Sequence, residues 1–158
     1  MKKYLTGVGV VLIMAGVWAV QAQKPQERKK IVYKGKTYLQ DAQYAHNSRI
    51  SKKAFDSLLA YGLVVRDSLN REYQAARYTF TYAERGVFED STGKLRIMTD
   101  YYSTESFAGK LPPEWLQPIR DRSKAGDTAF FFEVIYYQPG DTTRKQYHSE
   151  PLKLILTD

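Results

Sequence analysis

The alternation of apolar and polar residues is the clearest pattern along this chain, and it predicts β-strands. Segment 128–137 is rich in large apolar residues, and its alternate positions hold Phe130, Phe132, Val134 and Tyr136. Residues at alternate positions share one face of a strand, so these side chains are expected to point into a core. The other face, with Phe131, Glu133, Ile135 and Tyr137, carries a single charge, so the segment is predicted to be a central strand. Burial of each large side chain stabilises the fold by roughly 2 kcal/mol.

The same alternation predicts further strands elsewhere in the chain. The alternating positions are Ala76, Tyr78, Phe80 and Tyr82 in one strand, Leu95, Ile97 and Thr99 in another, and Leu152, Leu154 and Leu156, with Lys153 and Thr157 outward, in the last. Segment 90–94 predicts the turn that leads into the second of these strands. Segment 31–39 predicts a small hairpin in which Gly35 supplies a positive φ. The polar segment 142–149 fits either a strand or an extended crossover.

Helical signals are few and short. Ser51 is typical of a helix N-cap and Gly62 of a helix end. A second short helix is predicted from about 118 to 124, after a turn at 114–116, because Pro118 lacks the N–H that a helix interior needs. The residues expected on the shared apolar face of the first helix are Ala54, Phe55, Leu58 and Leu59.

These elements predict a mainly β protein, with an antiparallel Ig-like β-sandwich and one or two short helices as the best fit. In front of this domain, residues 1–22 have the basic start, apolar run and small residues of a secretory signal peptide. Residues 23–30 are expected to be a basic linker, and 31–158 a single sandwich domain. The protein is therefore predicted to be periplasmic or secreted. An uncleaved membrane anchor remains the alternative for the apolar run, although it is shorter than the roughly 20 residues of a spanning helix.

Charge and composition exclude several classes of function. The formal net charge of +7 is spread along the chain and interrupted by acidic residues, so nucleic-acid binding is not expected. Because the chain has no cysteine, it has no disulfide and no thiol nucleophile. His46 and His148 lie in no metal-binding spacing, and neither a GxSxG elbow nor a phosphate loop occurs. The sequence therefore predicts no catalytic residue, no metal, no cofactor and no enzyme activity.

Tyrosine is abundant, with 13 in the chain, and it is a common residue of protein interfaces and glycan-binding platforms. Tyr101 and Tyr102 lie in a polar stretch, 100–109, that is expected to be a loop. Tyr137 lies on the face of its strand opposite to the predicted core residues, and it is beside the predicted turn at 139–141. Since loops on a rigid scaffold often bind partners, these three tyrosines are the candidate partner-binding residues. The alternative that their rings fold back over the end of the domain remains open.

The order of elements along residues 48–156 adds a further expectation. A short Ser-capped segment is followed by an aromatic strand; later, Gly126 and Asp127 begin a strand that carries Phe132 and Ile135 and ends at the turn at 139–141. This order resembles the C-terminal domain of the gliding-motility protein GldM. The resemblance implies a periplasmic sandwich domain of the gliding and type IX secretion machinery, without enzyme activity.

Members of that family have a membrane helix and several domains, whereas a single domain is predicted in this chain. We therefore expect a free-standing relative that docks on an envelope protein. A carbohydrate-binding module that uses exposed tyrosines is the alternative function.

Overall fold

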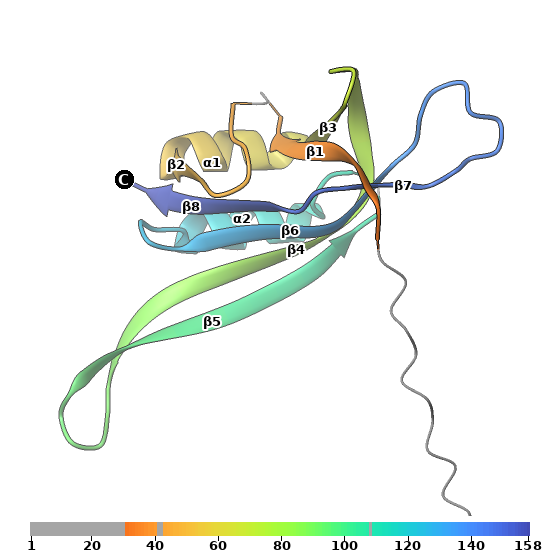
Figure 1. Cartoon of the computed structure of the whole chain (residues 1–158). Helices are drawn as coiled ribbons and strands as arrows, with labels where there is room; N and C mark the ends of the chain where they lie inside the picture. The colour runs from red at the N-terminus through yellow and green to blue at the C-terminus, as the bar shows by residue number, and fades with distance from the viewer. Residues whose placement is uncertain (1–30, 41–42, 108) are drawn as a thin grey trace, which may run out of the picture. The chain divides into compact units, whose positions relative to one another are not determined.

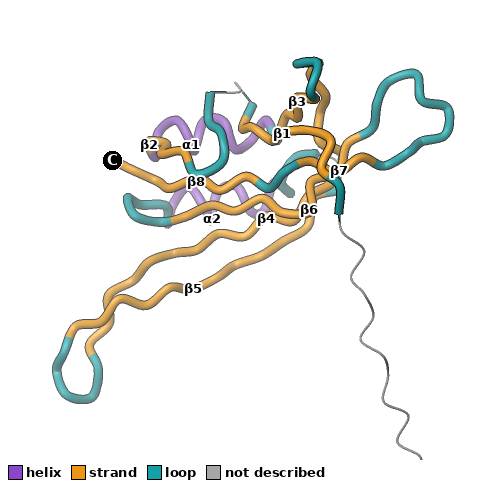
Figure 2. Tube along the Cα trace, in the orientation of Figure 1, coloured by secondary structure: helices purple, strands orange, loops and turns teal. Residues whose placement is uncertain are grey.

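A computed structural model describes residues 31–40, 43–107 and 109–158. The expected signal peptide and linker lie outside these residues. The prediction of a mainly β protein with short helices is confirmed (Figures 1 and 2). The strands are β1 (Tyr33–Leu39), β2 (Ser48–Ser51), β3 (Leu63–Asp67), β4 (Glu72–Glu89), β5 (Leu95–Ser106), β6 (Thr128–Tyr136), β7 (Tyr147–Ser149) and β8 (Leu152–Thr157), and the helices are α1 (Lys52–Leu58), the 3-10 turn η1 (Leu59–Tyr61) and α2 (Pro113–Arg122).

Hydrogen bonds join the strands into one mixed sheet in the order β2-β8-β6-β7-β1-β3-β4-β5. The β1–β7 and β2–β8 pairs are parallel, and the other pairs are antiparallel. The antiparallel Ig-like arrangement that the sequence predicted is therefore not confirmed. The polar segment 142–149 forms a strand only at its end, in β7.

Strand β6 closes this sheet on itself. One edge of β6 pairs with β4, and the other edge pairs first with β8 and then with β7. The series of paired strands β6, β7, β1, β3, β4 thereby returns to β6, so up to Ala83 of β4 these strands have no continuous free edge. Aromatic and aliphatic side chains of these strands fill the core, together with Phe55 of α1 and Ile119 of α2.

The register of β6 differs from the prediction in its first half. Phe131 is buried, with 1% of its surface exposed, whereas Phe132 is 40% exposed. Glu133 has a positive φ of 50° and lies where the β4–β6 register shifts, which marks a β-bulge. An extra residue reverses the inward phase, so Phe130 and Phe132 were predicted wrongly. Val134 and Tyr136, which follow the bulge, are buried as predicted.

A second register shift lies opposite, in β4. Ala75 is buried in place of the predicted Ala76, while Tyr78, Phe80 and Tyr82 are buried as predicted. The pairing runs from Ala75 with Tyr136 to Arg77 with Ile135, so one residue of β4 is unmatched there. The two irregularities compensate each other, because each strand carries one extra residue.

The first helix agrees with the sequence analysis and the second does not. Ser51 accepts a hydrogen bond from the N–H of Ala54 and caps α1, and Gly62 ends the following η1 turn. The separate turn and helix predicted at 114–124 are instead one helix, α2, with Pro118 inside it. The missing N–H of Pro118 removes a single helical hydrogen bond, and burial of Ile119 holds the helix on the core.

The hairpin predicted at 31–39 is also wrong, because β1 runs through it as one strand. Gly35 lies beside β3, and a Cβ atom built on it would be 2.5 Å from Cγ1 of Val65. Its lack of a side chain therefore serves the close approach of two strands rather than a turn. The alternation predicted for β8 is confirmed, with Leu152, Leu154 and Leu156 buried.

The register of β6 gives a direct mutational test. Phe131→Ala should lower the free energy of unfolding by about 3–5 kcal/mol, because it removes a fully buried ring. Phe132→Ala removes a ring that is partly in water and should cost about 1 kcal/mol or less. Urea unfolding midpoints of the two variants measure the difference. A larger loss for Phe132→Ala would contradict the bulge.

Candidate functional site

The longest hairpin extends past the rest of the sheet. Pairing of β4 with β6 ends where Ala83 faces Thr128, whereas pairing of β4 with β5 continues to Glu89 and Leu95. Residues 84–100 therefore form a two-stranded extension, called the ribbon below. Figure 1 shows it leaving the body of the domain, and Figure 2 shows its turn at the far end. At about 3.3 Å per residue, the extension is roughly 20 Å long.

The ribbon exposes large apolar side chains on both of its faces. Val87 and Ile97 are directly paired across the strands and are 69% and 65% exposed, with Leu95 (72%) on the same face. Phe88 and Met98, on the opposite face, are 40% and 47% exposed. A two-stranded hairpin is marginally stable in water, and exposed apolar patches are common at protein interaction sites, so this surface is the candidate binding site.

A buried carboxylate fixes the base of the ribbon. Asp127, which follows Gly126 at the start of β6, has no exposed surface. It accepts hydrogen bonds from the hydroxyl of Tyr82 at 2.5 Å and from the backbone N–H of Arg85 at 2.8 Å. The N–H of Lys124 is a third donor at 3.1 Å. The carboxylate thus binds the edge of β4 just before β6 begins, where the β4–β6 pairing ends.

This arrangement also explains the titration of the tyrosine. Burial, and next the hydrogen bond to the negative Asp127, raise the pKa of the Tyr82 phenol far above its ordinary value. Tyr82 therefore remains a hydrogen-bond donor at any physiological pH. Each hydrogen bond to a charged group contributes about 1.5–3 kcal/mol to stability, so this contact holds β4 firmly at the exit of the ribbon.

The charges next to this base are unequally compensated. Glu84 of β4 forms ion pairs with Lys124 at 3.2 Å and with Arg122 at 3.8 Å. Asp100 of β5 faces Glu84 directly across the strands, and like charges in this position repel. Among the residues that the structure describes, none of the ion pairs includes Asp100. An exposed carboxylate without a cation therefore lies at the base of the ribbon.

The turn at the far end is organised by another carboxylate. Asp90 accepts hydrogen bonds from the N–H and hydroxyl of Thr92, from the N–H of Lys94 and from Nε of Arg96. The hydroxyl of Thr92, then the guanidinium of Arg96 and the backbone donors, lower the pKa of Asp90 to about 2. The turn predicted at 90–94 is confirmed, and the hydrogen bond from the N–H of Asp90 to the carbonyl of Lys94, at 2.9 Å, continues the register of the ribbon into it.

The three candidate tyrosines lie in different places. The stretch 100–109 is not a loop, because β5 continues to Ser106, so Tyr101 and Tyr102 are strand residues on opposite faces. Tyr101 is 68% exposed and shares the face of Val87 and Ile97. Tyr102 packs against the core, and the guanidinium of Arg122 lies 4.6 Å from its ring centre.

Tyr137 belongs to another part of the domain. It follows the end of β6, is 43% exposed and accepts a hydrogen bond from the Gln146 amide at 3.3 Å. Its neighbour Tyr136 pairs with Ala75, whereas Tyr101 pairs with Ala83, a separation of roughly 25 Å along β4. The three tyrosines therefore do not form one patch, and their role in binding stays a prediction.

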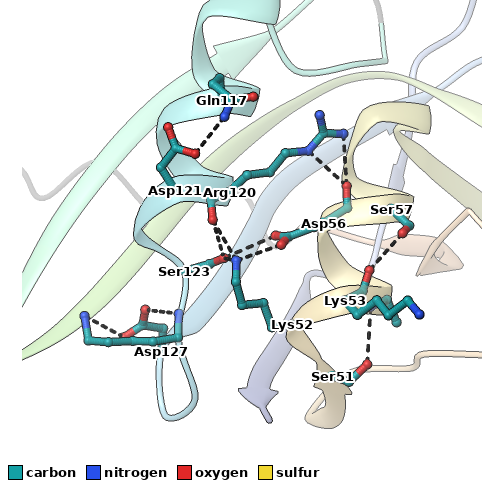
Figure 3. A network of polar contacts seen from close by, with 12 residues as sticks. Ser51, Lys52, Lys53, Asp56, Ser57, Gln117, Arg120, Asp121, Ser123 and Asp127 are labelled. Carbon is teal, nitrogen blue, oxygen red and sulfur yellow. Dashed lines mark hydrogen bonds and ion pairs between the residues drawn. The ribbon is translucent and has the colours of Figure 1, made fainter.

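A compact polar cluster joins α1 to α2 (Figure 3). The ammonium of Lys52 lies 2.7 Å from Oδ2 of Asp56 and donates to Oγ of Ser123 and to the carbonyl of Arg120. The side chain of Arg120 also donates to the carbonyl of Asp56, at 3.0 Å, so the cluster joins the two helices in both directions.

Other chemistry-bearing residues are dispersed. The Nδ1 atom of His46 lies 2.9 Å from the carbonyl of Pro151, and His148 is on β7. Within the described ranges, no group of His, Asp and Glu side chains is placed to hold a metal ion. No helix in this part of the chain is both long enough and apolar enough to cross a membrane.

No protein-family model matches the chain, and no curated protein matches it.

Sequence reasoning missed the ribbon because its strands were interpreted as parts of a sandwich. The signal was nevertheless present: Val87 is followed by Phe88, and Ile97 by Met98. Consecutive apolar residues put apolar side chains on both faces of a strand, which suits either a strand buried on both sides or one that is covered by a partner.

Titration of Asp90 tests the geometry of the ribbon turn. Its pKa is lowered from an ordinary value of 3.8 to about 2, so the charged form stabilises the turn above about pH 4, and that contribution is lost as the pH falls through 2. The amide chemical shifts of Thr92 and Lys94 should follow a transition with a midpoint near 2. In an Arg96→Gln variant the midpoint should rise toward 3.8. A wild-type midpoint near 3.8 would contradict the turn geometry.

Proposed function

We propose that this protein is a non-enzymatic docking domain of the cell envelope, and that the ribbon is the surface that contacts an envelope protein. The observation that carries the proposal is the concentration of exposed Val87, Leu95, Ile97 and Met98 on a ribbon that stands clear of a closed sheet. Burying such side chains contributes roughly 25 cal/mol per Å² of apolar surface. A rigid base and an apolar tip are what a docking element needs.

The chemistry of the tip favours a protein partner over the alternatives. Val87, Leu95, Ile97 and Met98 are aliphatic or thioether side chains, and Phe88 is less exposed than any of them, whereas glycan platforms use several exposed aromatic rings with polar groups. At the tip, Glu89 and Asp90 balance Lys94 and Arg96, so nothing there attracts an anionic lipid surface. An apolar tip with balanced charges fits the apolar groove or sheet of another protein.

Tyr101 extends this surface toward the body of the domain, since it shares a face with Val87 and Ile97. Of the predicted tyrosines, it is the one that the proposal includes. Kinship with the GldM C-terminal domain, its Ig-like arrangement and a link to gliding or type IX secretion remain part of this proposal. They are supported by the element order along 48–156, and the periplasmic location by the pattern of residues 1–22.

Site-specific photocrosslinking in intact cells tests the proposal. A photoreactive phenylalanine analogue at Val87 should give an adduct of discrete mass whose peptides come from another envelope protein. The same analogue at Leu69, which is 70% exposed on the β3–β4 turn, should not give this adduct. An analogue at Phe88 should lose its adduct when Ile97→Ser is added, with the melting temperature almost unchanged.

Two outcomes would contradict the proposal. Adducts that contain sugar would favour the carbohydrate-binding alternative. Adducts at Val87 that contain only peptides of this chain, or equal adducts at Val87 and Leu69, would show that no envelope protein docks on the ribbon.

A further inference from the structure

The outer edge of β5 is unprotected over a long distance. β5 ends the strand order, and its 12 residues pair with β4 alone among the described residues. The β4–β5 register runs without a bulge from Tyr78 and Ser106 to Glu89 and Leu95. β5 contains neither proline nor lysine, which are two of the devices that prevent edge-to-edge pairing. Such a strand offers a regular row of backbone donors and acceptors.

We propose that β5 pairs antiparallel with β5 of a second copy of this chain, about a two-fold axis at Met98. In such a pair, the residue that precedes Met98 by a given number faces the residue that follows Met98 by the same number in the partner. Two copies would then form one four-stranded sheet from their ribbons. Three or more strands with an apolar face are stable where a lone hairpin is marginal. This inference goes beyond the proposed docking function and does not depend on it.

Charge complementarity argues for a second copy as the occupant. Asp100 has no ion pair with any other described residue, and it faces Glu84 within its own hairpin. Pairing centred on Met98 puts Arg96 of each copy opposite Asp100 of the other, so two ion pairs form by symmetry. Arg96 binds Asp90 through Nε, at 2.6 Å, and a guanidinium has further N–H donors on its terminal nitrogens.

The other face of the pair is complementary in its apolar side chains. Leu95, 72% exposed, comes opposite Tyr101, 68% exposed, and Ile97 comes opposite Thr99. Such aromatic–aliphatic and β-branched pairs stabilise antiparallel strands. A shift of the axis to Ile97 would put Arg96 opposite Met98 and leave the guanidinium without a carboxylate on the facing strand. The axis at Met98 therefore gives ion pairs between Arg96 and Asp100 on one face and apolar contacts between Leu95 and Tyr101 on the other.

Charge reversal tests the pairing by the dissociation constant of the dimer, measured by sedimentation of the purified full chain. Asp100→Arg and Arg96→Asp should each weaken self-association about tenfold or more, since each replaces two attractions by two repulsions. Mixing these two variants should restore the dimer, because every arginine then faces an aspartate. Asp158→Arg, an equal charge change at the end of β8, should have no effect.

A wild-type chain that remains monomeric at 100 µM, or a mixture of the two variants no more associated than each alone, would overturn the pairing.

Cysteine crosslinking tests the register independently. Because the chain has no natural cysteine, an introduced cysteine can form a disulfide only with its copy in the partner chain. Met98→Cys should form a disulfide with itself in the partner copy under mild oxidation, since directly opposed strand residues have Cα atoms about 4.5–5.5 Å apart. Thr104→Cys, on the same strand, should not crosslink. Crosslinking at Ile97→Cys in place of Met98→Cys would overturn the stated axis, and equal crosslinking at residues 98 and 104 would show unspecific contact.

Discussion

The buried carboxylate of Asp127 is the interaction on which the rest of the structure depends. It binds the hydroxyl of Tyr82 and the N–H of Arg85, where β4 leaves the body, and thereby joins the start of β6 to the base of the ribbon. The backbone of Asp127 also accepts from the N–H of Leu156 in β8, at 2.9 Å. A single residue thus ties three strands together, and a buried charge left without these donors would be costly.

The closure of the sheet has a consequence for function. Because β6 pairs along both edges, the body has few backbone groups left to offer a partner. The free edge of β5 and a row of exposed apolar side chains lie together on the ribbon and β5: Val87, Phe88, Leu95, Ile97, Met98 and Tyr101. Docking of a partner on the faces of the ribbon and pairing of a second copy on its edge are compatible, because they use different groups. Self-pairing would enlarge the apolar faces that a partner contacts.

Several features followed directly from the sequence and others could not. Strict alternation located β8 and the buried Tyr78, Phe80 and Tyr82, and Ser51 and Gly62 marked the ends of the first helical segment. Phe130 and Phe132 were placed wrongly because a single bulge at Glu133 reverses the phase, and alternation carries no sign of an extra residue. Pro118 was misjudged because local propensity was outweighed by tertiary packing of Ile119.

The candidate site was harder to predict than the core. Tyr101 and Tyr102 were placed in a loop because Ser103, Thr104 and Glu105 are polar, but an edge strand exposed to water needs no apolar alternation. Residues such as Val87 and Ile97 have the composition of core positions. Whether they lie inside depends on where β6 stops pairing with β4, and that is decided by Asp127, far away in the sequence.

Amide hydrogen exchange along β4 and β5 of the purified protein, at a concentration where it is monomeric, tests the central claim most directly. A ribbon held at its base by Asp127 and free beyond it predicts strong protection up to Arg85 and a sharp fall in protection from Gly86 to Met98. Uniform protection along both strands in the monomer would contradict the account, since it would mean that the ribbon is already covered by its own chain.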